Sequence, residues 1–243
     1  MNELTGKRVL ITGGARHLGK AIALGMAQAG ARVAFTYLNS RDETRQTLAE
    51  VQKLDAKAQA IPCDIRNKES VAAAVRTAVD GLGGLDILVN NAGFFESAPF
   101  DQLTEDQWDN MFAINVRGPF LVSQQCLPML RASRGKIIHL GSLGGERPWA
   151  THAHYCSSKA ALHMLTRTMA KALAPEVAVN CVAPGMIDQG DGDREFLARM
   201  AAHTPMRRNG TADDIVNAVM FLATAAQFIT GQILFVDGGL GQR

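Results

Sequence analysis

A tyrosine and a lysine that could move a proton stand four residues apart in the segment YCSSK, as Tyr155 and Lys159. The surrounding pattern predicts a helix, and residues four apart on a helix lie on one face. A phenol ordinarily has a pKa of about 10, too high for easy proton exchange at neutral pH, and a nearby ammonium favours the phenolate. The pair therefore predicts a group that exchanges a proton with a reacting oxygen.

Ser142 and Asn115 are two further polar residues that could belong to such a site. Ser142 ends IIHLGS, directly after a predicted strand and thirteen positions before Tyr155. Asn115 lies in INVRGPF. A serine at a strand end is usually a turn residue, and an asparagine could merely satisfy a kink in a helix. Each residue alone therefore has a structural explanation.

Short apolar runs alternate with longer helical patterns along the whole chain. Several runs are almost continuously apolar, as in parallel strands that are covered on both faces. Thr104 with Gln107, and Thr211 with Asp214, read as capping boxes at the starts of two helices. The alternation predicts an α/β fold in a single domain over 1–243: a Rossmann-type, doubly wound parallel sheet of about seven strands, with helices on both faces and ligands beyond the carboxyl ends of the strands. The predicted strands are 8–12, 32–37, 58–62, 86–90, 136–140, 177–182 and 233–236.

The segment TGGARHLG, residues 12–19, joins the first predicted strand to a helix expected to begin near Leu18. Gly13 permits a tight turn, Gly19 permits close packing of the helix on the sheet, and free N–H groups at a helix N-terminus can hold a phosphate. Glycine-containing turns of this kind are also common as simple connections. The segment lacks the G-x-G-x-x-G spacing of a dinucleotide loop, because His17 stands among its glycines.

Several motifs follow one another in a fixed order: TGGARHLG, NNAG at 90–93, YCSSK, PG at 184–185 and VDGG at 236–239. With Asn115 and Ser142 in their places, this set resembles the short-chain dehydrogenase/reductase family along nearly the whole chain. The resemblance includes features of the 3-oxoacyl-[acyl-carrier-protein] reductases and of the pteridine-reductase-like branch. It implies an NAD(P)-dependent oxidoreductase that transfers hydride between a nicotinamide and a carbonyl or alcohol, or a pterin C=N.

The resemblance also implies catalytic roles. Tyr155 would exchange the proton, Lys159 would favour its phenolate, and Ser142 would donate a hydrogen bond to the substrate oxygen. Asn115 would support a water chain that returns protons to Lys159. A catalytically silent, NADPH-binding sensor on the same fold is the alternative, since a fold does not fix a function.

The cofactor implied is NADP(H) in preference to NAD(H). NAD-preferring relatives place a carboxylate at the end of the second strand, where this chain has Tyr37. Arg16 stands where NADP-using relatives carry a basic residue, and the side chain of His17 could reach an additional phosphate. The alternative is that Arg16 and Arg41 are ordinary solvated charges. The residues implied in cofactor binding are Gly13, Arg16, His17, Leu18, Tyr37, Asn39, Ser40, Arg41, Asp64, Ile65, Asn91, Ala92, Gly93, Tyr155, Lys159, Pro184, Gly185 and Ile187.

The substrate contacts expected are Phe95, from the resemblance, and His152 and His154, from their place just before Tyr155. Phe95 stands where pteridine reductases carry an aromatic ring against the pterin, although those enzymes tend to have aspartate at the position of Ser142. Phe95 could equally be an ordinary apolar pocket residue. His152 and His154 are expected at the substrate mouth and not at a metal, since no third ligand is near; the alternative is that they are simply polar loop residues. Residues near 186–205 correspond to the family's substrate lid.

Composition limits the remaining functional classes. The formal net charge is +2 with both signs spread along the chain, which indicates no basic stripe for nucleic acid. No apolar run approaches the roughly 20 residues of a membrane span. The four cysteines contain no C-x-x-C pair, which favours reduced thiols and a cytoplasmic protein. A small-molecule substrate and, from the resemblance, a homotetramer are expected.

Overall fold

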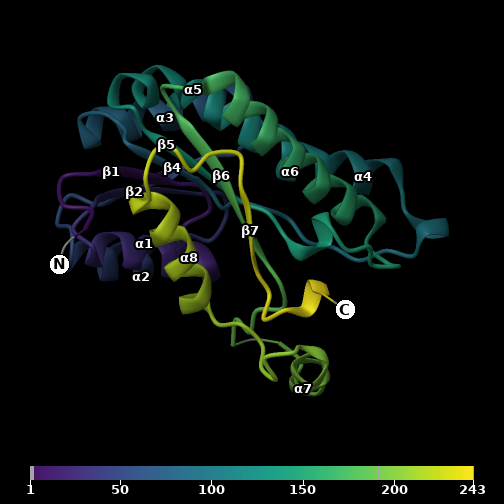
Figure 1. Cartoon of the computed structure of the whole chain (residues 1–243). Coiled ribbons are helices and arrows are strands. Elements are labelled where there is room, and N and C mark those ends of the chain that lie inside the picture. The colour runs from purple at the N-terminus through teal and green to yellow at the C-terminus, as the bar shows by residue number, and fades with distance from the viewer. Residues whose placement is uncertain (1–2, 191, 243) are drawn as a thin grey trace.

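The computed structural model describes residues 3–190 and 192–242 of the chain. These residues form one seven-stranded sheet in the order β3-β2-β1-β4-β5-β6-β7, and all neighbouring strands are parallel (Figure 1). The strand order reverses between β1 and β4, which creates the switch point beside which ligands bind in such sheets. The strands are β1 (Arg8–Ile11), β2 (Arg32–Tyr37), β3 (Gln59–Pro62), β4 (Ile87–Asn90), β5 (Lys136–Leu140), β6 (Ala178–Pro184) and β7 (Ile233–Val236).

Helices cover both faces of the sheet (Figure 1). One face carries α1 (His17–Gln28), α2 (Arg41–Gln52) and α8 (Ala212–Thr224); the other carries α3 (Lys68–Leu82), α5 (Gly118–Ser133) and α6 (Ala153–Leu173). Helix α4 (Glu105–Phe112) packs against α6, and a π-helical turn, Ala113–Arg117, joins it to α5. Helix α7 (Arg194–His203) lies apart from these layers, near the C-terminus in Figure 1.

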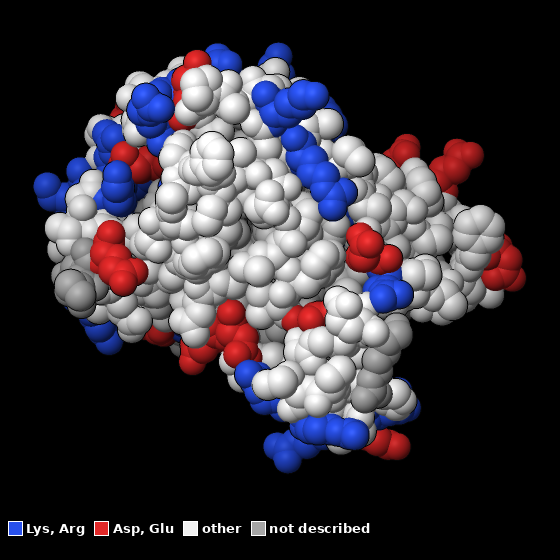
Figure 2. Space-filling view, viewed as in Figure 1, with Lys and Arg blue, Asp and Glu red and all other residues white. Residues whose placement is uncertain are grey.

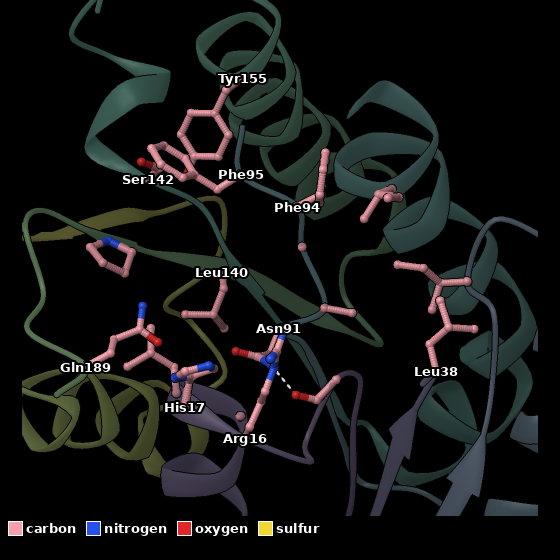
Figure 3. A pocket seen from close by; sticks show the side chains of 18 of the residues that line it. Arg16, His17, Leu38, Asn91, Phe94, Phe95, Leu140, Ser142, Tyr155 and Gln189 are labelled. Atoms are coloured by element: carbon pink, nitrogen blue, oxygen red, sulfur yellow. Dashed lines mark hydrogen bonds between the residues drawn. The ribbon is translucent and has the colours of Figure 1, made fainter. Parts of the chain in front are cut away.

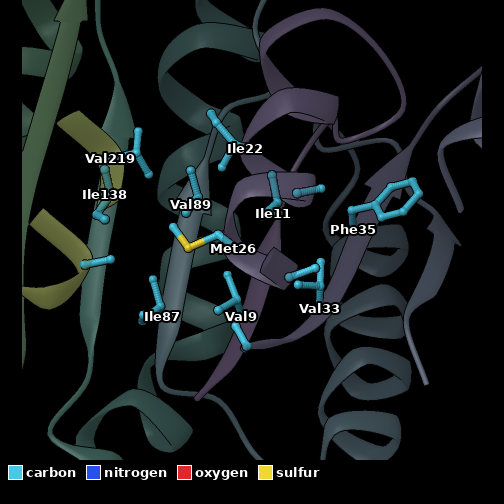
Figure 4. Close-up of a cluster of buried hydrophobic side chains, with 14 of the residues drawn as sticks. Val9, Ile11, Ile22, Met26, Val33, Phe35, Ile87, Val89, Ile138 and Val219 are labelled. Carbon is cyan, nitrogen blue, oxygen red and sulfur yellow. The ribbon is translucent and has the colours of Figure 1, made fainter. Parts of the chain in front are cut away.

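Two apolar cores hold the layers together because alternate residues of each strand face opposite helices. Figure 4 shows the core between the sheet and helices α1 and α8, where Val9, Ile11 and Val89 of the central strands meet Met26 and Val219. The second core places Leu10, Leu88 and Ile137 against α3 and α5. These cores fix the carboxyl ends of β1, β4 and β5, on which the candidate site is built.

The predicted fold class is confirmed, and the strand boundaries agree within two residues. The strands at 32–37, 136–140 and 233–236 match at both ends, whereas β6 continues to Pro184, two residues beyond the prediction. Both predicted capping boxes are present, with Thr104 and Thr211 as the N-caps. None of the described helices is both long and apolar enough to cross a membrane. Lys and Arg are interspersed with Asp and Glu on the face shown in Figure 2.

Candidate active site

A cleft of about 1000 Å³ lies at the carboxyl ends of the strands. Figure 3 shows Arg16 and His17 toward one end of it, and Ser142, Phe95 and Tyr155 toward the other. The cleft brings together most of the residues predicted from the sequence. Those that line it are Gly13, Arg16, His17, Leu18, Tyr37, Asn39, Ser40, Asp64, Ile65, Asn91, Ala92, Gly93, Phe95, Ser142, His152, Tyr155, Lys159, Pro184, Gly185 and Ile187.

The loop between β1 and α1 is a tight turn closed by its glycines. Gly13 has a φ of +67°, and a Cβ on Gly19 would overlap the carbonyl oxygen of Gly13. The side-chain amide of Asn91 ties the loop to β4, donating to the carbonyls of Thr12 and Gly13 at 3.0 Å each. The first N–H groups of α1 therefore face the cleft at a fixed position, where they can hold a phosphate.

His17 is the first residue of α1, one position before the predicted start, and its φ is +51°. This left-handed conformation is one that glycine adopts without strain and that costs other residues about 1 kcal/mol or more. The backbone thus keeps the shape that a glycine would have, with an imidazole added. Arg16 and His17 are both exposed and both line the cleft.

The end of β2 forms the neighbouring wall through Tyr37, Leu38, Asn39 and Ser40, and none of these side chains is acidic. Arg41, predicted to bind the cofactor, is exposed and does not line the cleft. The physical reason is that it is already the first residue of α2, which leads the chain away from the end of β2.

Asp64 lies across this end of the cleft and is paired with an arginine that sequence analysis did not single out. The Arg66 guanidinium contacts the Asp64 carboxylate at 2.7 Å and lowers the pKa of that carboxyl. Arg66 also donates to the side-chain oxygen of Asn110 at 3.1 Å. The pair lines the cleft after β3, where its opposite charges offset each other.

Tyr155 and Lys159 are buried on one face of α6, as their spacing predicts. The Lys159 ammonium donates to the Leu140 carbonyl at 2.9 Å and lies 5.8 Å from the centre of the Tyr155 ring. Burial raises the pKa of Tyr155 to about 12, although a hydrogen bond with Ser142 acts in the opposite direction. This direction differs from the sequence-based expectation, because burial outweighs the effect of neighbouring groups. At neutral pH Tyr155 therefore holds its proton and can donate it.

Burial also acts on Lys159, lowering the pKa of its ammonium to about 8. A lysine of this kind is still mostly charged at neutral pH and can exchange a proton slightly above it. Ser142, on the side of Tyr155, is held by two contacts of its own: its hydroxyl accepts from the Gly144 N–H at 3.0 Å, and its N–H donates to His163 Nε2 at 3.5 Å.

Asn115 lies behind the cleft wall and does not line the cleft. Its side-chain oxygen accepts from the Phe94 N–H at 2.8 Å, and its amide donates to the Phe94 carbonyl at 2.9 Å and to the Ser158 hydroxyl at 3.1 Å. Asn115 stands in the π-helical turn. Its hydrogen bonds therefore agree with the structural alternative, in which this asparagine satisfies an irregularity of the helix. If Asn115 also takes part in proton movement, it must do so with the side-chain amide that makes these hydrogen bonds.

His154 was expected at the substrate mouth, and this prediction is wrong. Its side chain is fully buried in α6, and neither ring nitrogen has a hydrogen-bond partner in the part of the chain that is described. Tyr155 faces the cleft, and the next position along a helix points about 100° away, so two adjacent residues cannot both face it. His152, which precedes α6, does line the cleft.

Aromatic rings form the wall beside Tyr155. Phe95 stacks on His152 with centroids 4.9 Å apart and meets Tyr155 edge-on at 4.8 Å. Trp149 lies nearly parallel to Tyr155 at 5.9 Å. Trp149 was not predicted at the cleft, because nothing in its local sequence distinguishes it from an ordinary loop residue. Gln189 and Phe196, which belong to the predicted lid near 186–205 but were not singled out there, also line the cleft.

The cleft has the size and the donors for a dinucleotide. The glycine-closed turn and the backbone at the start of α1 would hold its phosphates, and the polar residues at the ends of β2 and β3 would hold its ribose and base. No group of three His, Cys, Asp or Glu side chains suited to a metal ion occurs in residues 3–190 or 192–242.

Comparison with known proteins agrees with this geometry. The family model described as enoyl-(acyl carrier protein) reductase matches residues 13–241. The 3-oxoacyl-[acyl-carrier-protein] reductase FabG of Staphylococcus aureus is 35% identical over 240 residues, covering 96% of this chain and 98% of that protein. Nodulation protein G of Rhizobium sp. is 35% identical over 247 residues, covering 99% of each.

A solved structure shows the same similarity in three dimensions. The short-chain dehydrogenase/reductase from Serratia marcescens is 39% identical, covers 98% of this chain and 99% of its own, and superposes with a TM-score of 0.92. The sequence identity, the fold and the arrangement of residues around Tyr155 all indicate the same family. The chain belongs to the short-chain dehydrogenase/reductase family and is an oxidoreductase similar to the 3-oxoacyl-[acyl-carrier-protein] reductases.

Proposed function

We propose that the protein is an NADP(H)-dependent oxidoreductase that transfers hydride between nicotinamide and a carbonyl or alcohol, with Ser142, Tyr155, Lys159 and Asn115 as its catalytic residues. One observation carries the proposal. Tyr155, Ser142 and Lys159 line the same cleft as the start of α1, so one bound dinucleotide could reach from the phosphate-binding turn to the tyrosine. When bound, the nicotinamide supplies or accepts the hydride.

The protein's own residues handle the proton and the charge on oxygen. Tyr155, protonated at neutral pH, donates its proton to the oxygen that becomes an alcohol. Ser142 stabilises the same oxygen with a hydrogen bond. Lys159, 5.8 Å from the ring centre, stabilises the phenolate left behind. Asn115 anchors the Phe94 backbone beside Lys159 and supports the return of the proton through water.

NADP(H) is preferred over NAD(H) in this proposal because of the charges near the end of β2. A 2′-phosphate carries negative charge that a carboxylate would repel and an arginine would bind. The end of β2 contributes no acidic side chain to the cleft, and Arg16 lines the cleft from the start of α1. His17, which follows Arg16 in the same turn, can add a further hydrogen bond to phosphate.

The substrate is a small molecule that carries a C=O or, in the second class that we consider, a pterin C=N. Phe95 beside Tyr155 favours either kind when it is part of a ring. We propose that residues near 186–205 act as a lid, because Gln189 and Phe196 of this segment already line the cleft; residue 191 lies outside the described residues. A homotetramer in the cytoplasm is the expected setting.

Replacing Tyr155 by phenylalanine tests the proposal. Tyr155→Phe keeps the ring packing and removes the proton donor, so turnover of any accepted substrate should fall by about 100-fold to 10,000-fold. The Kd for NADPH should stay within about twofold, because the phosphates are expected at the start of α1, away from Tyr155, and the ring itself is kept. NADPH oxidation and fluorescence titration measure the two quantities. Retention of most activity would overturn the mechanism, and NADPH binding without turnover by the unaltered protein would favour the sensor.

A further inference from the structure

Charge is unevenly distributed in the cleft. Among the described residues that line it, the Lys, Arg, Asp and Glu side chains are Arg16, Asp64, Arg66 and Lys159. The first three stand at the start of α1 and just after β3, at the end where we place the adenine nucleotide. Arg66 and Asp64 are already paired with each other. Of these four charged side chains, Lys159 is therefore the one that lies near the reacting group.

Lys159 is not placed to bind a charged substituent of the substrate. It is buried beneath the wall, it donates to the Leu140 carbonyl at 2.9 Å, and it supports Tyr155. His152 provides no cation either. Burial, together with the nearby His154, lowers the pKa of His152, which leaves it a neutral imidazole at pH 7. A carboxylate or phosphate on the substrate would lose hydration here and gain no partner.

The wall around Tyr155 is made of rings in mutual contact. The Phe95, Trp149, His152 and Tyr155 centroids lie between 4.8 Å and 6.5 Å from one another. At these distances the rings support each other and leave no slot between them for a substrate ring. The cluster is a rigid wall, and Phe95, with 59% of its surface exposed, presents the face on which a substrate can lie.

An aromatic side chain also comes from the segment around α7. Phe196, 38% exposed, lines the cleft together with Met186 and Gln189. This segment therefore adds apolar surface to the lining of the cleft. Aromatic pairs add stability beyond the area that they bury, which an extended alkyl chain does not obtain.

We infer that the substrate is an uncharged, flat ring compound whose reacting C=O or C=N is attached to or part of the ring, and that Phe95 and Trp149 determine this specificity. The ring lies against Phe95, and the reacting oxygen or nitrogen reaches Ser142 and Tyr155. This inference rests on the proposed function, since it names the substrate class of the same site. It excludes substrates whose recognition depends on a carboxylate or phosphate close to the carbonyl.

A matched set of compounds tests the class, with NADPH oxidation as the readout. The set is acetophenone, its eight-carbon straight-chain counterpart methyl hexyl ketone, para-acetylbenzoate, dihydrobiopterin and acetoacetyl-coenzyme A. We expect kcat/KM for acetophenone or dihydrobiopterin to exceed that for methyl hexyl ketone by about tenfold. We expect para-acetylbenzoate to fall about 100-fold below acetophenone, because its carboxylate is desolvated without a partner.

Variants then assign the preference to the wall. Phe95→Leu and Trp149→Leu should each lower kcat/KM for the preferred ring compound by about tenfold and change it less than twofold for methyl hexyl ketone. Phe100→Leu is the matched control, because Phe100 is 75% exposed and does not line the cleft. It should leave both values unchanged.

The possible failures are distinguishable. Preferred turnover of acetoacetyl-coenzyme A, methyl hexyl ketone or para-acetylbenzoate would overturn the substrate class and leave the proposed function standing. Equal losses for ring and straight-chain ketones in Phe95→Leu and Trp149→Leu would overturn the assignment to these two residues. No turnover of any of the five compounds would overturn both the class and the proposed function.

Discussion

The residue that best shows how burial controls protonation in this protein is His139. It is fully buried on β5, where its Nδ1 faces the Asn90 amide at 3.2 Å, and that amide also donates to Ser123 at 3.0 Å. Burial first, and the charge of Lys159 second, lower the pKa of His139 to about 3. An unfolded histidine has a pKa of about 6.5, so the unfolded chain takes up this proton before the folded chain does.

Acid should therefore destabilise the protein through His139. The stability that the neutral, buried His139 contributes to the fold is fully present above pH 6.5 and is lost as the pH falls from about 6.5 towards 3. The His139→Asn variant lacks this titrating group. Between pH 7 and pH 5, the free energy of unfolding of the unaltered protein should therefore fall by about 2 kcal/mol more than that of the variant. Urea unfolding at both pH values measures the difference, and pH 8 gives the cost of the substitution itself. Parallel curves for the two proteins would show that the pKa of His139 is the same in the folded and the unfolded chain, and would contradict the prediction.

At the scale of elements, the proposed preference for NADP(H) depends on the start of α1. Arg16 precedes the helix and lines the cleft, whereas Arg41 begins α2 and does not. Arg16→Ala should weaken NADPH binding by about tenfold and NADH binding by less than twofold, because only NADPH offers a 2′-phosphate. Arg41→Ala is the matched control and should change neither Kd. Fluorescence titration measures all four constants; equal losses of NADPH and NADH in Arg16→Ala would show that Arg16 does not bind this phosphate.

Elements that depend on local signals were predictable from the sequence. Thr211 caps α8 because a threonine with an acid three residues later satisfies free N–H groups within one turn. Lys136–Leu140 is a strand because it is a short apolar run, and such runs form buried parallel strands. The start of α1 and the bounds of β1, β3, β4 and β6 differ by one or two residues from the prediction, since pairing at the end of an element depends on the neighbouring strand or loop.

Features that depend on packing between distant segments were not predictable in the same way. The π-helical turn at Ala113–Arg117 forms where Asn115 bonds to the Phe94 backbone, and no local pattern signals this contact. The same reason explains the cleft position of Trp149 and the burial of His154. The proposed catalytic residues could be singled out from the sequence because their type and order carry information that a single packing residue does not.

At the scale of the whole molecule, one apolar surface is left uncovered on the α5 and α6 side of the sheet. A groove of about 540 Å³ there is lined by Phe112, Val116, Phe120 and Leu165 with neighbouring residues, and Phe120 is 43% exposed. A contiguous apolar patch of this kind usually marks an interface. We expect copies of the chain to pair through this surface in the proposed homotetramer.

Light scattering after size-exclusion chromatography tests this expectation. The unaltered protein should elute as a tetramer at micromolar concentration. Phe120→Glu places a carboxylate in the apolar surface and should reduce the assembly to dimers or monomers, because an unpaired charge buried in an interface costs several kcal/mol. Leu54→Glu is the matched control, since Leu54 is 46% exposed and follows α2 on the other side of the sheet. A tetramer that persists in Phe120→Glu would place the interface elsewhere, and a monomeric unaltered protein would overturn the expected assembly.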